Sequence, residues 1–287
     1  MSAAAIAFSS DSALLAALDE QGRVTVYSNE VPCYALPLKS GWGAGRSRRA
    51  LGRPLAVAWR PLSSDLALCF ERGVVLVRKN DDKAEMEIAC SPRAMAWHGR
   101  GRILFVAEAA RVLAFDAAAP GQVEVVSRVR GATSLAWSDA AGLAVGGAKH
   151  VRVLQSLGEE VWTPGGRVSA SWTADGKAFY FAGSRGLCKV AWPSKAASTL
   201  LTPSELAEVR AACGAGCGES EPCVASNGEG LTVALCFGAP STAVALVRVL
   251  DKAATAVPCE SPCALAWSSR GVLAVATPSG LRFFEHA

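Results

Sequence analysis

The sequence has few of the residues on which enzymes most often depend. Only three histidines, His98, His150 and His286, occur among 287 residues, and none has a nearby serine or cysteine in a known catalytic arrangement. The chain also lacks the Gly-x-Ser-x-Gly elbow, the His-Glu-x-x-His zinc motif and the Gly-x-Gly-x-x-Gly dinucleotide fingerprint. We therefore expect a protein that is not an enzyme, has no catalytic residues and needs no cofactor.

The chain has neither a strong charge imbalance nor a long apolar run. It carries 29 Lys and Arg against 25 Asp and Glu, a net charge of +4, which does not by itself indicate a nucleic-acid surface. Residues 1–4 are small and uncharged and do not resemble a secretory signal. The uncharged run 231–247 is interrupted by Gly238 to Thr242. It predicts two strands joined by a turn, so we expect no transmembrane segment and no direct nucleic-acid partner.

Ten cysteines are present, and without a secretory signal we expect them to be reduced thiols. Cys213, Cys217 and Cys223, with Cys259 and Cys263, could form a zinc site. The Cys-x3-Cys spacing and the lack of a nearby histidine favour a glycine-rich loop without metal. We expect no metal ligands, and the sequence leaves open whether Cys213, Cys217 and Cys223 bind one.

The sequence does contain a repeated four-residue phrase, in the order small, apolar, small, aromatic. Its aromatic positions are Phe8, Trp59, Trp97, Trp137, Trp172 and Trp267. Most of them lie about 40 residues apart, and the last interval is roughly twice as long. Cys223 to Ser226 is therefore interpreted as a degenerate seventh copy. Seven units of this size are typical of a β-propeller.

Each phrase is followed by a short polar turn and by further apolar runs, as expected for adjacent strands. Asp11, Asp139 and Asp175 recur in these turns, where turn chemistry explains them better than catalysis. Small residues in the phrase permit the close approach of inner strands, and the aromatic residue can pack between blades. We predict an all-β, seven-bladed, WD-repeat-like β-propeller that forms a single domain over 1–287. A β-sandwich is the alternative, but it does not need one phrase at one period.

The order of strands predicts an incomplete last blade. The chain begins with the inner strand of the first blade and reaches the third strand of the seventh near Phe284. This blade should lack its own outer strand and present an open backbone edge at Leu281, Arg282, Phe283 and Phe284. An open edge invites pairing with a partner strand.

Two stretches, 39–54 and 193–222, break the period and are expected to be insertions. The first holds Trp42 with Arg46, Arg48, Arg49 and Arg53. It is interpreted either as a basic, aromatic patch that binds an acidic partner or as a solvated loop. The second contains a predicted helix over 203–210, for which Thr202 is a suitable N-cap.

The repeats resemble degenerate WD repeats, although no Gly-His pair opens a unit and no Trp-Asp pair closes one. A narrower likeness lies in the second unit. Trp59-Arg60-Pro61-Leu62-Ser63, followed by Asp65-Leu66-Ala67-Leu68, is similar to a phrase of the aladins, WD-repeat proteins of the nuclear pore complex. Segments of the first and fifth units and the Cys- and Gly-rich stretch near 213–223 also resemble aladin counterparts.

This resemblance implies a non-enzymatic scaffold of the nuclear pore complex. Such a protein would bind other proteins through rims and loops and would be held at the nuclear envelope by a membrane nucleoporin. The alternative is a WD-repeat adaptor subunit of a trafficking, ciliary or RNA-processing complex, located in the cytoplasm.

Overall fold

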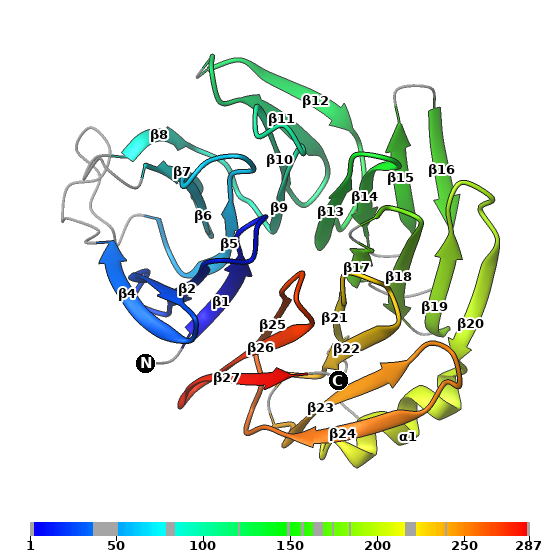
Figure 1. Cartoon of the computed structure of the whole chain (residues 1–287). Helices are drawn as coiled ribbons and strands as arrows, with labels where there is room; N and C mark the ends of the chain where they lie inside the picture. Colours follow the sequence, from blue (N-terminus) through cyan, green and yellow to red (C-terminus); the bar gives the residue numbers. More distant parts are fainter. Residues whose placement is uncertain are drawn as a thin grey trace. The chain divides into compact units, whose positions relative to one another are not determined.

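The computed structural model describes residues 3–36, 51–78, 84–119, 121–147, 150–155, 158–162, 169–173, 175–183, 185–215, 222–238 and 240–285. The chain divides into two compact units, Met1–Ala132 and Thr133–Ala287. Within the described ranges the chain forms seven antiparallel sheets, each built from strands consecutive in sequence (Figure 1).

The first unit contains three four-stranded blades. Their strands are β1 (Ala3–Phe8), β2 (Leu15–Asp19), β3 (Val24–Ser28) and β4 (Val31–Leu36); β5 (Pro54–Trp59), β6 (Leu66–Phe70), β7 (Gly73–Val77) and β8 (Ala84–Ile88); and β9 (Ala94–Trp97), β10 (Ile103–Ala107), β11 (Val112–Asp116) and β12 (Val123–Ser127).

The second unit contains three four-stranded blades and a three-stranded one. Its strands are β13 (Ser134–Ser138), β14 (Gly142–Gly146), β15 (Val151–Gln155) and β16 (Gly158–Trp162); β17 (Ser169–Trp172), β18 (Ala178–Gly183), β19 (Gly186–Ala191) and β20 (Ala197–Leu201); β21 (Cys223–Ser226), β22 (Thr232–Cys236), β23 (Ala243–Arg248) and β24 (Ala254–Pro258); and β25 (Ala264–Trp267), β26 (Val272–Thr277) and β27 (Gly280–Glu285).

The predicted all-β fold with seven blades is confirmed, as is the seventh blade with three strands among the described residues. The degenerate phrase at Cys223 to Ser226 forms the inner strand β21 of the sixth blade, as expected. One boundary differs from the expectation. The range 193–222, interpreted as an insertion, contains the fourth strand of the fifth blade, β20. Its exposed Ala197-Ser198-Thr199 sequence lacks the apolar alternation that would have revealed a strand.

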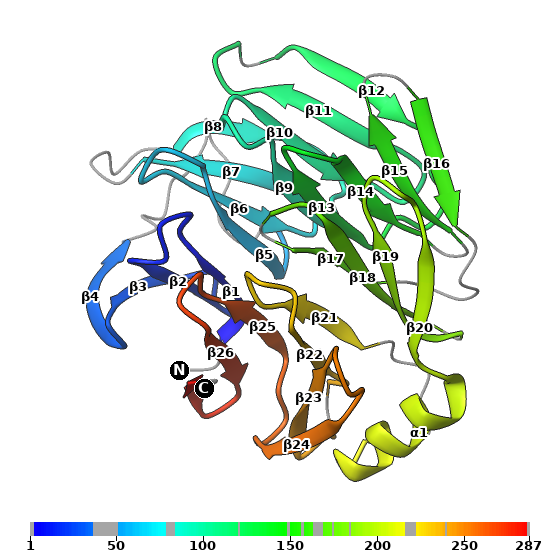
Figure 2. The same ribbon diagram turned by 45° about the vertical axis from the view of Figure 1, so that its right-hand side comes forward.

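The helix α1 (Pro203–Ala212) follows β20 and confirms the predicted helix. The Thr202 side chain accepts a hydrogen bond from the Glu205 backbone, and the Glu205 carboxylate accepts one from the Thr202 backbone N–H, which forms a capping box. Leu206 is buried, and Figures 1 and 2 show α1 beside β20 and β24. The uncharged run 231–247 forms β22, a turn and the start of β23. None of the described helices could cross a membrane.

The second strand of every blade forms the centre of its core. All residues of β2, β6, β18 and β22 are buried, and β10, β14 and β26 are buried except at their first residue. Side chains on both faces of these strands are buried, so the strands read as continuous apolar runs rather than alternating ones.

The aromatic residue that ends the inner strand packs across to the preceding blade. Trp59 of β5 packs in one cluster with Ala16 and Leu18 of β2. Trp172 of β17 packs with Val151 and Val153 of β15. The predicted place of the aromatic residues, between neighbouring blades, is therefore confirmed for these two positions. It explains why the phrase ends on a large side chain.

The indole nitrogens distinguish two kinds of interface. Trp59 Nε1 donates to the Ala7 carbonyl at 2.9 Å, and Trp267 Nε1 donates to the Ala225 carbonyl at 3.1 Å. Ala7 and Ala225 hold the same place in the inner strands of the preceding blades. The buried Nε1 atoms of Trp97 and Trp172 have no hydrogen-bond partner among the described residues.

Trp172 and Trp59 therefore allow the indole hydrogen bond to be isolated. We expect Trp172→Ala to lower the free energy of unfolding by about 3–5 kcal/mol, because a buried aromatic side chain is lost.

Phe in place of Trp removes the same atoms at both sites, but only Trp59→Phe removes a hydrogen bond. Trp59→Phe should therefore destabilise more than Trp172→Phe, by about 1 kcal/mol in urea unfolding. Equal losses would show that the bond to Ala7 contributes nothing.

Candidate interaction surfaces

The predicted basic, aromatic patch lies mostly outside the described residues. Trp42, Arg46, Arg48 and Arg49 fall within 37–50 and stay predictions. Arg53 is exposed immediately before β5, and its backbone N–H donates to Glu71 Oε2 at 3.2 Å. The structure thus places one residue of the patch at the surface of the second blade.

The turns between the first and second strands share one hydrogen-bonding pattern. In each blade the N–H of the fourth turn residue donates to the carbonyl of the first. These bonds join Ser12 to Ser9, Ser63 to Arg60, Gly101 to His98, Ala141 to Ser138, Gly176 to Thr173, Gly230 to Asn227 and Gly271 to Ser268. In five blades the fourth residue has a positive φ, at Ser12, Gly101, Gly176, Gly230 and Gly271. Glycine recurs there because it adopts positive φ at no steric cost.

The second blade departs from this pattern. Its positive φ, +62°, falls one residue earlier, on Leu62, directly after Pro61. Proline followed by positive φ, closed by the hydrogen bond from Ser63 to Arg60, is the arrangement of a type II turn. That turn strongly favours glycine where this chain has leucine. A bulky residue in this conformation costs on the order of 1–3 kcal/mol.

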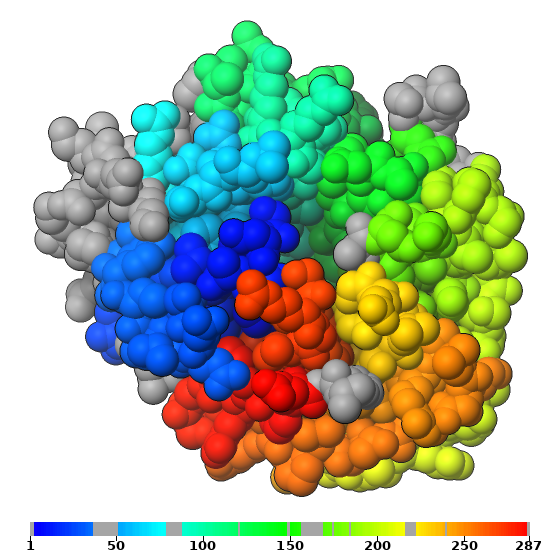
Figure 3. All heavy atoms as spheres, in the orientation of Figure 1, coloured from blue at the N-terminus to red at the C-terminus, as the bar shows by residue number. Residues whose placement is uncertain are grey.

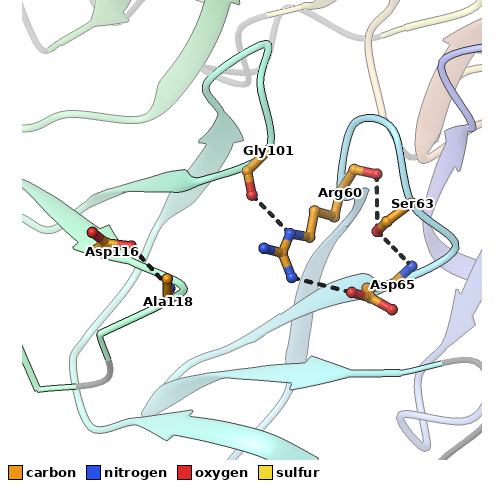
Figure 4. Close-up of polar contacts among 6 residues, drawn as sticks. All are labelled: Arg60, Ser63, Asp65, Gly101, Asp116 and Ala118. Carbon is orange, nitrogen blue, oxygen red and sulfur yellow. Dashed lines mark hydrogen bonds and ion pairs between the residues drawn. The ribbon is translucent and has the colours of Figure 1, made fainter.

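The other side chains of this turn hold it against the third blade (Figure 4). Arg60 Nε donates to the Gly101 carbonyl at 2.7 Å, and Arg60 Nη1 forms an ion pair with Asp65 at 3.2 Å. The Arg60 guanidinium also lies 5.7 Å from the centre of the Trp97 ring, a cation–π distance. A Cβ on Gly101 would lie 2.5 Å from the Pro61 carbonyl oxygen, so only glycine fits beneath this turn.

Ser63 and Asp116 each accept a hydrogen bond from the backbone N–H two residues further along their own loops. Ser63 Oγ accepts a hydrogen bond from the Asp65 N–H at 3.1 Å. In Figure 4, Asp116 accepts a bond from the Ala118 N–H at 2.8 Å after β11. The paired Arg102 guanidinium and the Ala118 N–H lower the pKa of the Asp116 carboxyl. These polar groups therefore hold the loops in place.

Leu62 is the member of the turn that makes no such contact. It is 85% exposed and lies at the rim of a groove of about 260 Å³ between the first two blades. The groove is lined by Ser9, Ser10, Asp11, Leu14, Trp59, Leu62, Ser63 and Ser64. We call it the Leu62 groove. In the sequence, Leu62 stands out only as part of the phrase Trp59 to Ser63. The sequence signal for an unusual turn is leucine directly after proline, where a type II turn favours glycine or asparagine.

A second groove, of about 660 Å³, lies between the sixth and seventh blades. It includes the turn residues Leu231 and Leu250, which are 45% and 87% exposed. Arg248 and Asp251 pair with each other at 2.7 Å along this groove. Leu250 is as exposed as Leu62 but does not have a positive φ.

The predicted open edge is present at β27. Leu281, Phe283 and Phe284 are half-buried and Arg282 is exposed. In the sheet order β25-β26-β27, no described strand pairs with the outer edge of β27. The structure thus places these four predicted residues together on one edge strand.

The residues considered for catalysis support turns instead. Asp11 Oδ1 accepts bonds from Ser9 Oγ and the Ala13 N–H, and Asp175 Oδ1 accepts bonds from Thr173 Oγ1 and the Lys177 N–H. The Lys177 N–H and the Thr173 hydroxyl lower the pKa of Asp175. Asp139 accepts a bond from Trp137 Nε1 at 2.7 Å. The predicted turn role is therefore seen directly for Asp11 and Asp175.

The cysteines are spread over several strands and loops. Burial raises the pKa of Cys69 and of Cys236 to about 12, which keeps both as thiols. Cys213 is buried after α1, Cys223 is exposed at the start of β21, and Cys217 lies outside the described residues. In the part of the chain that the structure describes, no three His, Cys, Asp or Glu side chains gather in a way that could hold a metal.

Comparisons with known proteins show the fold alone. No family model matches the chain, and no curated protein matches it. Among solved structures, the chain is similar to the β-propeller domain of Myceliophteria thermophila Cps50 (Swd1), with a TM-score of 0.78. The match covers 99% of this chain and 96% of that one, at 12% sequence identity. At this identity the likeness supports the propeller architecture and no particular partner.

Leu62 and Leu250 form a matched pair for testing the turn. Both are almost fully exposed, and they differ in the sign of φ. Leu62→Gly should raise the free energy of unfolding by about 1 kcal/mol, because it removes backbone strain and little buried surface. Leu250→Gly should leave it unchanged or lower it by up to about 1 kcal/mol, since glycine gains unfolded-state entropy there. Urea unfolding measures both, and a destabilised Leu62→Gly would contradict the strained turn.

Proposed function

We propose that this chain is a non-enzymatic scaffold that binds other proteins through its rims and loops. A β-propeller is a fold typical of protein-interaction scaffolds. We propose further that it serves as an aladin-like component of the nuclear pore complex, at the nuclear envelope beside a membrane nucleoporin. The resemblance of Trp59 to Ser63 to the aladin phrase supports this finer assignment.

The observation that carries the scaffold function is the exposed, strained Leu62. Within the phrase, Trp59 packs between blades, Arg60 binds the neighbouring turn and Ser63 closes its own turn. Leu62 stabilises nothing comparable and adopts a backbone conformation that costs energy. An exposed leucine alone would be unremarkable, but one held out at such a cost indicates a contact outside the chain.

The Leu62 groove suits a polypeptide. Leu62 offers an apolar anchor, and the serines with Asp11 offer hydroxyl and carboxylate groups to a backbone or a polar side chain. Burying most of one leucine is worth about 1.5–3 kcal/mol, which is enough for an interface hot spot. The mixed lining favours protein recognition over a deep small-molecule site.

Affinity purification of the tagged chain with mass spectrometry tests both levels of the proposal. Recovery of nucleoporins would support the nuclear pore assignment. Stable recovery of a trafficking, ciliary or RNA-processing complex instead would support the WD-repeat adaptor. We expect Leu62→Gly to reduce partner recovery several-fold, because the anchor is lost while the fold is retained. Leu250→Gly is the matched control, and an equal loss for both variants would remove Leu62 from the interface.

The basic patch is tested separately. Replacing Arg46, Arg48, Arg49 and Arg53 together by Glu should weaken recovery of an acidic partner and leave thermal unfolding unchanged. The unsubstituted chain should also recover less of the acidic partner at high salt, because exposed charges are screened. Unchanged recovery at low salt would assign these residues to a solvated loop.

A further inference from the structure

The third strand of the seventh blade is apolar in sequence but not buried. Its six counterparts, β3, β7, β11, β15, β19 and β23, each contain apolar residues with essentially no exposure, and each pairs with a fourth strand. In β27, by contrast, Leu281, Phe283 and Phe284 are only half-buried. Phe284 packs against the cluster of Leu273 and Val275 and still remains partly open. Red atoms of this strand lie at the surface in Figure 3.

The outer edge of β27 therefore has two unmet needs. Every second residue of an edge strand directs its N–H and C=O groups away from the sheet, and the described residues offer no strand to receive them. Two phenylalanines and a leucine keep apolar surface that a fourth strand covers in the other blades. An added strand would satisfy both needs at once.

The fourth and second blades show what kind of strand fits. In the fourth blade, the third strand Val151-Arg152-Val153-Leu154 matches Leu281-Arg282-Phe283-Phe284 in pattern. The pairings Leu143 with Leu154 and Leu273 with Phe284 set this alignment. Arg152 and Arg282 therefore hold the same place in their blades. Opposite Arg152, β16 places Val161, whereas in the second blade, where Val75 holds this place, β8 (Ala-Glu-Met-Glu-Ile) places Glu87.

Acidic residues occur in three of the six described fourth strands. β8 carries Glu85 and Glu87, β12 carries Glu124, and β16 carries Glu159 and Glu160, each among apolar residues. Arg282 is exposed and forms no ion pair with a described carboxylate. Charge complementarity thus points to an acidic occupant for the edge of β27.

We propose that a partner polypeptide completes the seventh blade by adding a strand of alternating apolar and acidic residues along β27. Backbone hydrogen bonds supply the attachment, the apolar side chains cover Leu281, Phe283 and Phe284, and a carboxylate pairs with Arg282. This surface is separate from the Leu62 groove and does not depend on the nuclear pore assignment.

A charge-swap experiment tests the proposal. The probe is a fluorescein-labelled peptide containing the β8 sequence Ala-Glu-Met-Glu-Ile, and its counterpart contains Ala-Lys-Met-Lys-Ile. The acidic peptide should bind the full chain in fluorescence anisotropy and protect amides of 280–285 in hydrogen exchange. Arg282→Glu should weaken the acidic peptide about tenfold and give affinity for the basic one. Because Arg282 is exposed, this substitution should leave thermal unfolding unchanged.

Arg270→Glu is the matched control, because Arg270 is an exposed arginine of the same blade that lies outside β27. It should change the affinity for either peptide less than twofold. The proposal is overturned if the acidic peptide does not bind, if Arg270→Glu weakens its binding as much as Arg282→Glu, or if protection appears along β7 instead. A concentration-dependent dimer that Arg282→Glu dissolves would assign the edge to a second copy and would also overturn it.

Discussion

The packing of a large aromatic side chain against the preceding blade, as at Trp59 and Trp172, is the constraint on which the described structure depends. A single four-stranded sheet buries too little apolar surface to be stable alone, so each blade must share a core with the next. Trp59 and Trp172 do this inside the two units by packing on strands of the preceding blade. The small residues before the tryptophan follow from the same need, since they let the inner strand approach its neighbour.

The turns at the ends of the inner strands are the second point of contact between blades. Gly101 lies under Pro61, Gly176 lies against Ser138 and Gly230 lies against Thr173, so the turn of one blade rests on the turn before it. Most of these turns are determined by packing and by the positive φ of their fourth residue. The turn at Leu62 keeps the contact through Arg60, but its positive φ falls one residue earlier, on an exposed leucine. A position with this geometry is free to serve recognition without weakening the core.

The two surfaces that we propose for binding are places where the repeat is interrupted. Leu62 interrupts the turn pattern, and β27 interrupts the pattern of buried third strands. Both interruptions expose apolar groups beside polar ones, the combination that binds polypeptides rather than small molecules. An interaction scaffold with more than one contact site can bring partners together, because a second binding event becomes intramolecular.

The sequence by itself determined the repeat, the seven blades, the helix with its Thr202 cap and the incomplete last blade. These features depend on local periodicity, capping residues and turn chemistry, all of which act between residues close in the chain. Only the tertiary structure decided that Ala197 to Leu201 is a strand, that Leu62 is exposed with positive φ and that β27 remains half-buried. Burial and exposure depend on neighbours distant in sequence, and backbone strain becomes visible only when the chain is folded against them. For that reason the sequence could name the phrase around Trp59 but could not single out its exposed leucine with positive φ.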